Sequence, residues 1–207
     1  MDLKKYGMSP YIAISLVGIL CFLSGIVIAG CNEVGWDPWV NTLSDLGVSD
    51  SSLTSSTFNI SCYIAGICVF IFGLGLCVFS KDSLQKIGGM SIMVGGCGLF
   101  LVGAMTLSNV TMHNIATGLF CIPLVIGIIL VTLHHFAIRN PFIMKSSIVV
   151  LLVTLIQWPI FTGALSEIAS ILCAIGWWVT QFLDSLRFKA AAIASEEMEI
   201  TPSHSSF

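Results

Sequence analysis

The chain has 207 residues, of which 56% are hydrophobic and only 9% are charged, and its formal net charge is −3. Soluble domains carry about 25% charged residues, so the composition excludes an ordinary soluble protein and indicates an integral membrane protein. A transmembrane helix needs about 20 mainly apolar residues, and six runs of the sequence meet this requirement. They are 11–30, 58–79, 87–107, 114–136, 146–165 and 168–186.

The six runs predict an all-α fold, a polytopic integral membrane protein built as a six-helix transmembrane bundle. They leave no room for a soluble domain, so residues 1–189 are expected to form a single membrane domain. Residues 190–207 contain Glu196, Glu197 and Glu199 among small polar side chains. This composition is typical of a disordered tail.

The basic residues orient the bundle, because all eight fall on one side of the predicted membrane. They are Lys4, Lys5, Lys81, Lys86, Arg139, Lys145, Arg187 and Lys189. Short loops rich in Lys and Arg stay cytoplasmic, so both termini are predicted to be cytoplasmic and the protein is expected in the cell membrane. The outer segments carry acidic residues, which would repel nucleic acid and attract cations or amine head groups.

The first outer loop, about 31–56, is the longest and has signals of internal structure. Asp37 followed by Pro38 is typical of a helix start, and Gly47 of a helix stop. Together they predict a short helix over 38–46, which lies at the interface or caps the mouth of the bundle. Trp36 and Trp39 are expected to act as interfacial anchors.

Glycines recur along the third apolar run. Gly89, Gly96 and Gly103 are spaced by seven residues, with Gly88 and Gly95 beside them. Small residues on one stripe let membrane helices approach closely, so this pattern predicts helix packing.

The apolar runs also contain Pro123, Pro159 and most of the eight cysteines. Pro123 and Pro159 are expected to kink the fourth and fifth runs, since membrane helices tolerate such kinks. Seven of the eight cysteines lie within apolar runs, where cysteine behaves as a small hydrophobic residue. No disulfide framework is therefore predicted.

Three titratable residues are expected at the outer ends of three helices. Asp45 lies on the predicted short helix, His113 before the fourth run and Glu167 before the sixth. Carboxylates beside an imidazole could form an acid–base pair or hold a divalent cation, so these three are the candidate catalytic residues. The candidate substrate-binding residues are Asn41, Ser44 and Asn114.

A structural role for the two acids is the alternative, because acidic side chains near a helix start complement the helix dipole. This reading fits Glu167 well and Asp45 poorly, since Asp45 is expected near the end of its helix. A Ser-His-Asp triad would need Ser44 aligned with His113, and the glycines of a nucleophile elbow do not flank Ser44.

Several segments resemble the six-span prokaryotic family called domain of unknown function 998. The likeness covers nearly the whole chain apart from the tail and rests on Asn-Thr-Leu-Ser-Asp-Leu-Gly at 41–47, Phe58-Asn59, His113-Asn114, Gly163 and Glu167. A weaker likeness links the Ser-Asp loop to the Frag1/DRAM/Sfk1 membrane proteins. An Arg often follows the glutamate in the family, whereas Ile168 follows it here. The resemblance implies a fold and a topology, and it implies no reaction.

The sequence therefore predicts a membrane protein that binds, and could process, a lipid head group or polar precursor at an acidic outer site. A non-catalytic scaffold or accessory subunit is the competing hypothesis, with the glycine stripe and the Trp-rich rim as surfaces for a protein partner. A facilitator for a small solute is a weaker third hypothesis. Between the interfacial ends of the six runs there is no Asp, Glu, Lys, Arg or His, whereas ion-coupled transporters normally have such a residue there.

Overall fold

The computed structural model of the protein describes residues 9–157 and 159–200, and these residues are almost entirely helical. The long helices are α1 (Ser9–Asn32), α3 (Ser52–Phe79), α4 (Ser83–Ala104), α5 (Val110–Ala137), α6 (Pro141–Gln157) and α7 (Gly163–Ile200). A single-turn helix, α2 (Leu43–Leu46), lies in the loop after α1, and a 3-10 turn, η2 (Leu107–Asn109), precedes α5. The predicted all-α fold is confirmed.

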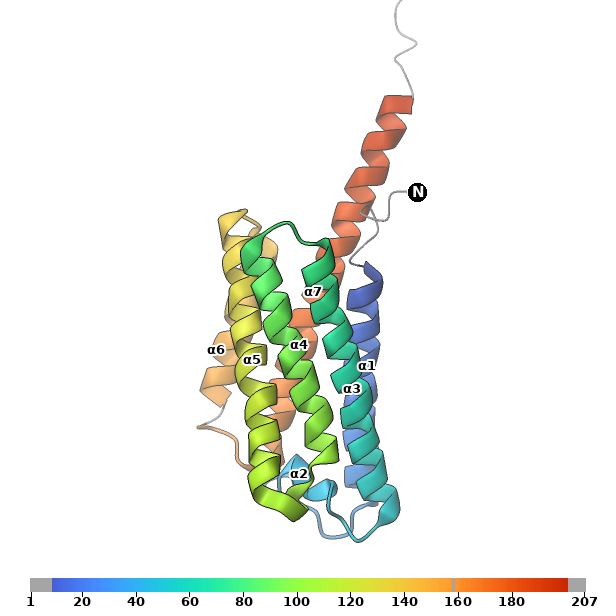
Figure 1. Ribbon diagram of the computed structural model, residues 1–207, viewed down its shortest axis with the longest axis vertical. Coiled ribbons are helices and arrows are strands. Elements are labelled where there is room, and N and C mark those ends of the chain that lie inside the picture. The colour runs from blue at the N-terminus through green and yellow to red at the C-terminus, as the bar shows by residue number, and fades with distance from the viewer. Residues whose placement is uncertain (1–8, 158, 201–207) are drawn as a thin grey trace, which may run out of the picture.

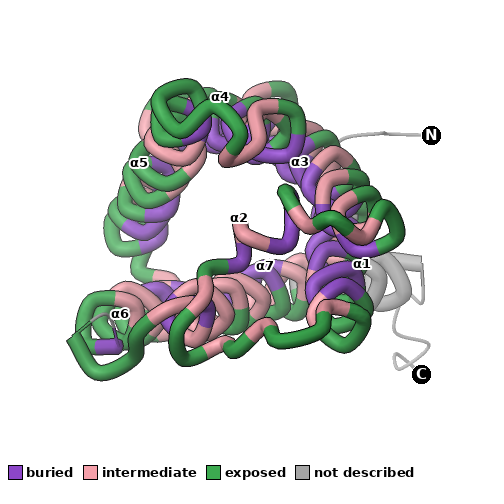
Figure 2. The backbone as a smooth tube through the Cα atoms, turned by 90° about the horizontal axis from the view of Figure 1, so that it is seen from below, coloured by how far each residue is buried: buried purple, intermediate pink, exposed green. Residues whose placement is uncertain are grey.

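The long helices alternate in direction and form a closed ring (Figures 1 and 2). Packing runs from α1 to α3, α4, α5, α6 and α7 in turn, and α7 also packs against α1. α2 lies inside the ring at the lower end of Figure 1 (Figure 2). Its two leucines, Leu43 and Leu46, are 4% and 0% exposed and belong to the same apolar cluster as Phe22 and Phe58.

A second apolar cluster fills the other half of the ring. Phe72 of α3 contacts both Trp177 and Trp178 of α7, at ring-centroid distances of 6.0 and 5.4 Å. The indole N–H of Trp177 donates to Ser147 Oγ of α6 (2.7 Å), so this buried polar atom has a partner, as buried polar groups require.

Five of the helices are long and apolar enough to cross a membrane, and α6 is a shorter apolar helix of 17 residues. The fifth predicted run, 146–165, is therefore wrong at both ends, since α6 begins at Pro141 and ends at Gln157. Pro159 lies in the turn after α6 and does not kink a helix, because a proline has no N–H to continue the hydrogen-bond ladder. Pro123, by contrast, lies inside α5.

The last helix differs from the prediction at both of its ends. It begins at Gly163, five residues before the predicted start of the sixth run, and it continues to Ile200. Residues 190–200, which the composition assigns to a disordered tail, are thus helical. The rest of that tail, 201–207, lies outside the described residues.

The glycines of α4 face two neighbours, and the predicted role in helix packing is confirmed. A Cβ atom on Gly96 would lie 2.6 Å from the backbone nitrogen of Phe70 and 2.8 Å from the carbonyl oxygen of Gly66, both on α3. A Cβ atom on Gly88 would lie 3.2 Å from the carbonyl oxygen of Gly127 on α5. The stripe is therefore occupied within this chain, and it offers no free surface to a partner.

This packing predicts opposite effects for the same substitution at two glycines. Alanine favours a helix interior over glycine by about 1 kcal/mol, but at Gly96 the added methyl would press on the backbone of α3, and overpacking costs about 1–3 kcal/mol. We expect Gly96→Ala to lower the thermal unfolding temperature of the purified protein in detergent. Gly118→Ala is the control, because nothing lies within 4 Å of a Cβ atom there. Equal melting of the two variants would contradict the packing described for α4.

Candidate functional site

The loop between α1 and α3 does not form the predicted helix 38–46 but two separate turns. In the first turn, the backbone N–H groups of Val40 and Asn41 donate to the carbonyl of Asp37 (3.0 and 2.8 Å). Thr42 is extended (φ −90°, ψ 165°), and α2 begins only at Leu43. The break arises because Asn41 Oδ1 turns back to accept from the N–H of Asp37 (2.9 Å), which closes the first turn on itself.

Asp45 acts as a capping residue of α2. It is the third residue of that helix, and its Oδ2 accepts from the backbone N–H of Thr42, the residue before the helix (2.7 Å). The expectation that Asp45 lies near the end of a longer helix is thus wrong, and the alternative structural role applies to it. Gly47 follows the last turn, as predicted.

Glu167 reaches across from α7 to the same helix start. Its Oε2 accepts from the backbone N–H of Leu43 (2.7 Å), a contact between residues 124 positions apart. The first N–H groups of a helix have no partner within it, so Asp45 and Glu167 together satisfy two donors at the start of α2. Glu167 therefore caps a different helix from the one that carries it.

The start of α7 is capped in return by the loop. The N–H of Ala164 donates to the carbonyl of Asn41 (2.6 Å), and the N–H of Leu165 donates to that of Pro38 (3.2 Å). Gly163 has φ +54°, and a Cβ atom there would lie 2.7 Å from the Asn41 carbonyl oxygen. Only glycine fits this close approach in the left-handed region without strain.

His113 of α5 connects Ser44 of α2 to the end of α4. Its Nε2 lies 2.9 Å from Ser44 Oγ, and its Nδ1 lies 2.6 Å from the carbonyl oxygen of Met105. A carbonyl can only accept, so Nδ1 carries a proton and, in the neutral imidazole, Nε2 accepts the hydroxyl proton of Ser44. The alignment of Ser44 with His113 is present without a nucleophile elbow.

The structure brings together four of the six predicted site residues. His113 is 5% exposed, and Ser44, Asp45 and Glu167 are half-buried. Asp45 and Glu167 bind the backbone N–H groups of two consecutive residues, Thr42 and Leu43. Asn41 shapes the loop through its side chain and carbonyl, whereas Asn114 is exposed and lies outside this hydrogen-bonded group.

Comparison with known protein families tests the family membership that the loop residues suggest. Residues 16–184 match the family described as a protein of unknown function (DUF998). The chain belongs to this family. The match does not extend to the Frag1/DRAM/Sfk1 proteins, and no curated protein and no solved structure matches the chain.

Asn59 is one of the residues on which the resemblance to DUF998 rests, and the sequence did not predict its role. Its Nδ2 donates to the carbonyl of Gly47 (3.1 Å), which ties the end of α2 to α3. Met105 was missed as well, since only its carbonyl takes part. It follows the last residue of α4, where carbonyls lack a helical partner, and the short connection to α5 brings it to His113.

A divalent cation finds no ligand set in this DUF998 protein within the residues that the structure describes. No group of three or more His, Cys, Asp and Glu side chains is placed there to hold a metal ion. One oxygen of each carboxylate, Asp45 Oδ2 and Glu167 Oε2, is engaged by a backbone N–H.

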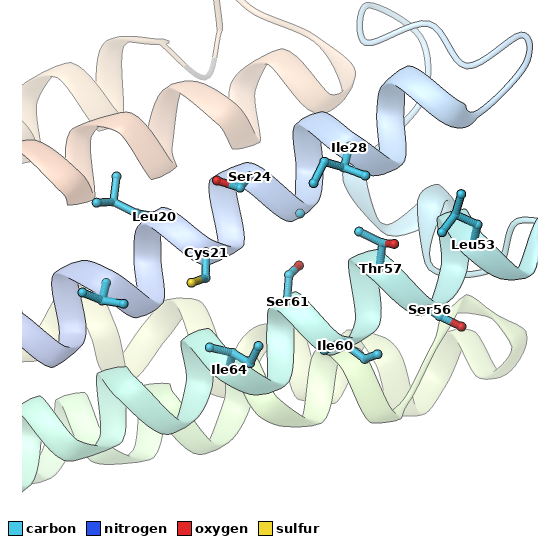
Figure 3. Close-up of a pocket in the computed structure, with 12 residues that line it drawn as sticks. Leu20, Cys21, Ser24, Ile28, Leu53, Ser56, Thr57, Ile60, Ser61 and Ile64 are labelled. Carbon is cyan, nitrogen blue, oxygen red and sulfur yellow. The ribbon is translucent and has the colours of Figure 1, made fainter.

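A groove of about 650 Å³ runs between α1 and α3 (Figure 3). Apolar side chains such as Leu20, Ile28 and Ile60 border it, with the hydroxyls of Ser24 and Thr57 among them. Its lining does not include Ser44, Asp45, His113 or Glu167. The groove is therefore a separate feature of the membrane-facing surface.

The cross-capping by Glu167 predicts a matched pair of outcomes. Glu167→Ala leaves the Leu43 N–H without its acceptor, and an unsatisfied buried donor costs about 1–3 kcal/mol. We expect this variant to melt at a lower temperature in detergent and to be cleaved faster by protease within the loop.

Glu167→Gln is the control, because its amide oxygen can still accept from Leu43, and it should melt close to the wild type. If alanine and glutamine at this position behave alike, the capping role of the carboxylate is wrong.

Proposed function

We propose that this DUF998 protein crosses the cell membrane six times, with both termini in the cytoplasm. The connections from α3 to α4 and from α5 to α6 lie at the end of the ring opposite α2 (Figure 1). Lys81 lies in the first connection and Arg139 in the second, and Lys86 and Lys145 lie near the starts of α4 and α6, which supports this orientation. The 17 residues of α6 span about 25 Å at 1.5 Å per residue, close to the roughly 30 Å of a bilayer core.

Reporter fusions test the topology. Fusions after Lys86, Arg139 and Lys189 should read cytoplasmic, and fusions near Asp50 and Val110 should read external. A fusion at Phe161, in the turn between α6 and α7, should also read external if α6 crosses the membrane. A cytoplasmic signal at Phe161 would reduce the protein to five spans, and one at Asp50 would place the site on the wrong side.

At the outer end, the protein is proposed to bind the polar head group of a membrane lipid or a polar precursor that carries an amine. The observation that carries this proposal is the group around α2 formed by the buried His113 and the half-buried Ser44, Asp45 and Glu167. Each carboxylate uses one oxygen in capping and can offer its second oxygen to an ammonium group, since a carboxylate has about four acceptor positions. The acidic surroundings attract cations and repel anions.

Two observations disfavour the other hypotheses. Of the surfaces that the scaffold hypothesis named, the glycines of α4 are occupied by α3 and α5, and the indole N–H of Trp36 donates to the Thr42 carbonyl within the loop (3.1 Å). Trp39 remains 59% exposed. A solute facilitator would need an open mouth, and Leu43 and Leu46 of α2 are packed into the apolar cluster at that end.

Lipid binding can be tested by native mass spectrometry of the purified protein. We expect phosphatidylethanolamine, which carries an amine, to bind more tightly than phosphatidylglycerol, which does not. The double variant Asp45→Asn, Glu167→Gln keeps both capping acceptors and removes both charges. We expect its preference for phosphatidylethanolamine over phosphatidylglycerol to fall by about fivefold, which corresponds to about 1 kcal/mol for an ion pair.

Asp50→Asn is the matched control, because Asp50 is exposed and precedes α3 in the same loop. It should keep the wild-type preference. An unchanged preference in the double variant, with unchanged melting, would refute the proposed head-group site.

A further inference from the structure

Ser44 and His113 have the arrangement of a nucleophile and its base. The hydroxyl oxygen of Ser44 lies 2.9 Å from Nε2, and the opposite ring nitrogen is fixed by the Met105 carbonyl at 2.6 Å. A serine hydroxyl becomes nucleophilic when an adjacent base, itself oriented by a third group, can take its proton. Here the backbone carbonyl is that third group, so the tautomer that activates Ser44 is built into the fold.

The neighbouring charges favour the proton transfer. When His113 takes the proton of Ser44, it becomes an imidazolium, and an opposite charge nearby stabilises that form. Asp45 follows Ser44 directly on α2, and Glu167 accepts from the backbone N–H of Leu43, the residue before Ser44. Both carboxylates are fixed by backbone N–H groups, so they need not move during the reaction.

The same charges select the electrophile. A phosphate group at the Ser44 hydroxyl would place its negative charge beside Asp45, the next residue of α2, which is unfavourable. The carbonyl carbon of an ester is neutral, and an ester in a membrane lipid lies close to the polar head group. The site therefore suits acyl chemistry better than phosphoryl chemistry.

We propose that Ser44 is a catalytic nucleophile that accepts an acyl group from a lipid ester, with His113 as general base. The inference rests on the lipid-binding function proposed above. Ser44 Oγ attacks the ester carbonyl while its proton passes to His113 Nε2. The ester C–O bond then breaks, the leaving alcohol takes that proton, and an acyl-Ser44 ester remains. Water attacks this ester in the second half, again through His113, and releases the carboxylic acid and the free serine.

A purely structural role would also place these atoms together, because the contact ties α2 to α5. The two roles differ in the reactivity of the hydroxyl. A hydroxyl that serves only as a structural contact does not react with a fluorophosphonate, whereas an activated serine displaces the fluoride and forms a phosphonate ester.

The test is to treat the purified full chain in detergent with a fluorophosphonate probe and to locate the label by peptide mass spectrometry. The proposal expects one label at Ser44 in the wild type and none in Ser44→Ala. His113→Gln should slow labelling by about 100-fold or more, the range for loss of a general base. His134→Gln is the control, because His134 sits at the other end of α5, beside Asp82 (3.1 Å), and it should label like the wild type.

Ser56 gives a second control within the same molecule, because it is an exposed serine on α3 and should stay unlabelled. This comparison holds even if His113→Gln fails to fold. An unlabelled Ser44 in protein that melts normally, or equal labelling of Ser44 and Ser56, would overturn the proposal. Lipid binding without labelling would refute the nucleophile alone. A labelled Ser44 without any amine preference would support the nucleophile and refute the proposed head-group specificity.

Discussion

The architecture depends on a reciprocal capping between the loop that joins α1 to α3 and the start of α7. The carbonyls of Pro38 and Asn41 accept from the first N–H groups of α7, and Glu167 of α7 accepts from the first N–H of α2. Each half satisfies backbone donors that a helix start leaves open. A buried donor without an acceptor costs about 1–3 kcal/mol, so the loop and the start of α7 stabilise each other.

This exchange explains why a single-turn helix can exist inside the ring. A helix of four residues is far too short to be stable by itself, since forming the first turn is unfavourable. α2 is instead fixed by contacts at both ends and on its apolar side. Glu167 and Asp45 cap its start, Asn59 binds the carbonyl of Gly47, and the two leucines fill the apolar cluster. The remaining side chain, Ser44, is thereby presented to His113.

Much of the fold follows from the sequence because membrane helices are specified by local composition. The apolar runs predicted the long helices, and the glycines of α4 predicted the close packing that the ring shows. The predicted end of the fifth run differs from the end of α6, because the apolar residues continue past Gln157, where the helix ends. The predicted helix over 38–46 was wrong for a different reason. Asn41 and Thr42 are compatible with a helix, and the break at Thr42 is favoured both by the Asn41 side chain, which accepts from Asp37, and by the carbonyls of Pro38 and Asn41, which accept from α7.

The candidate site shows the same division between local and distant causes. The sequence placed Asp45, His113 and Glu167 at the same end of three helices, because residue types and topology sufficed for that. It could not predict the partner of each group, since Glu167 accepts from a residue 124 positions away and Met105 contributes only a backbone carbonyl.

The capping role of the two carboxylates is compatible with the proposed catalytic role of Ser44 and His113. A carboxylate held by a backbone N–H is already oriented and loses no further freedom when charge develops beside it, and fixed charge of this kind is what stabilises a transition state most effectively. The capping that builds α2 is therefore also what gives Ser44 and His113 a preorganised acidic environment.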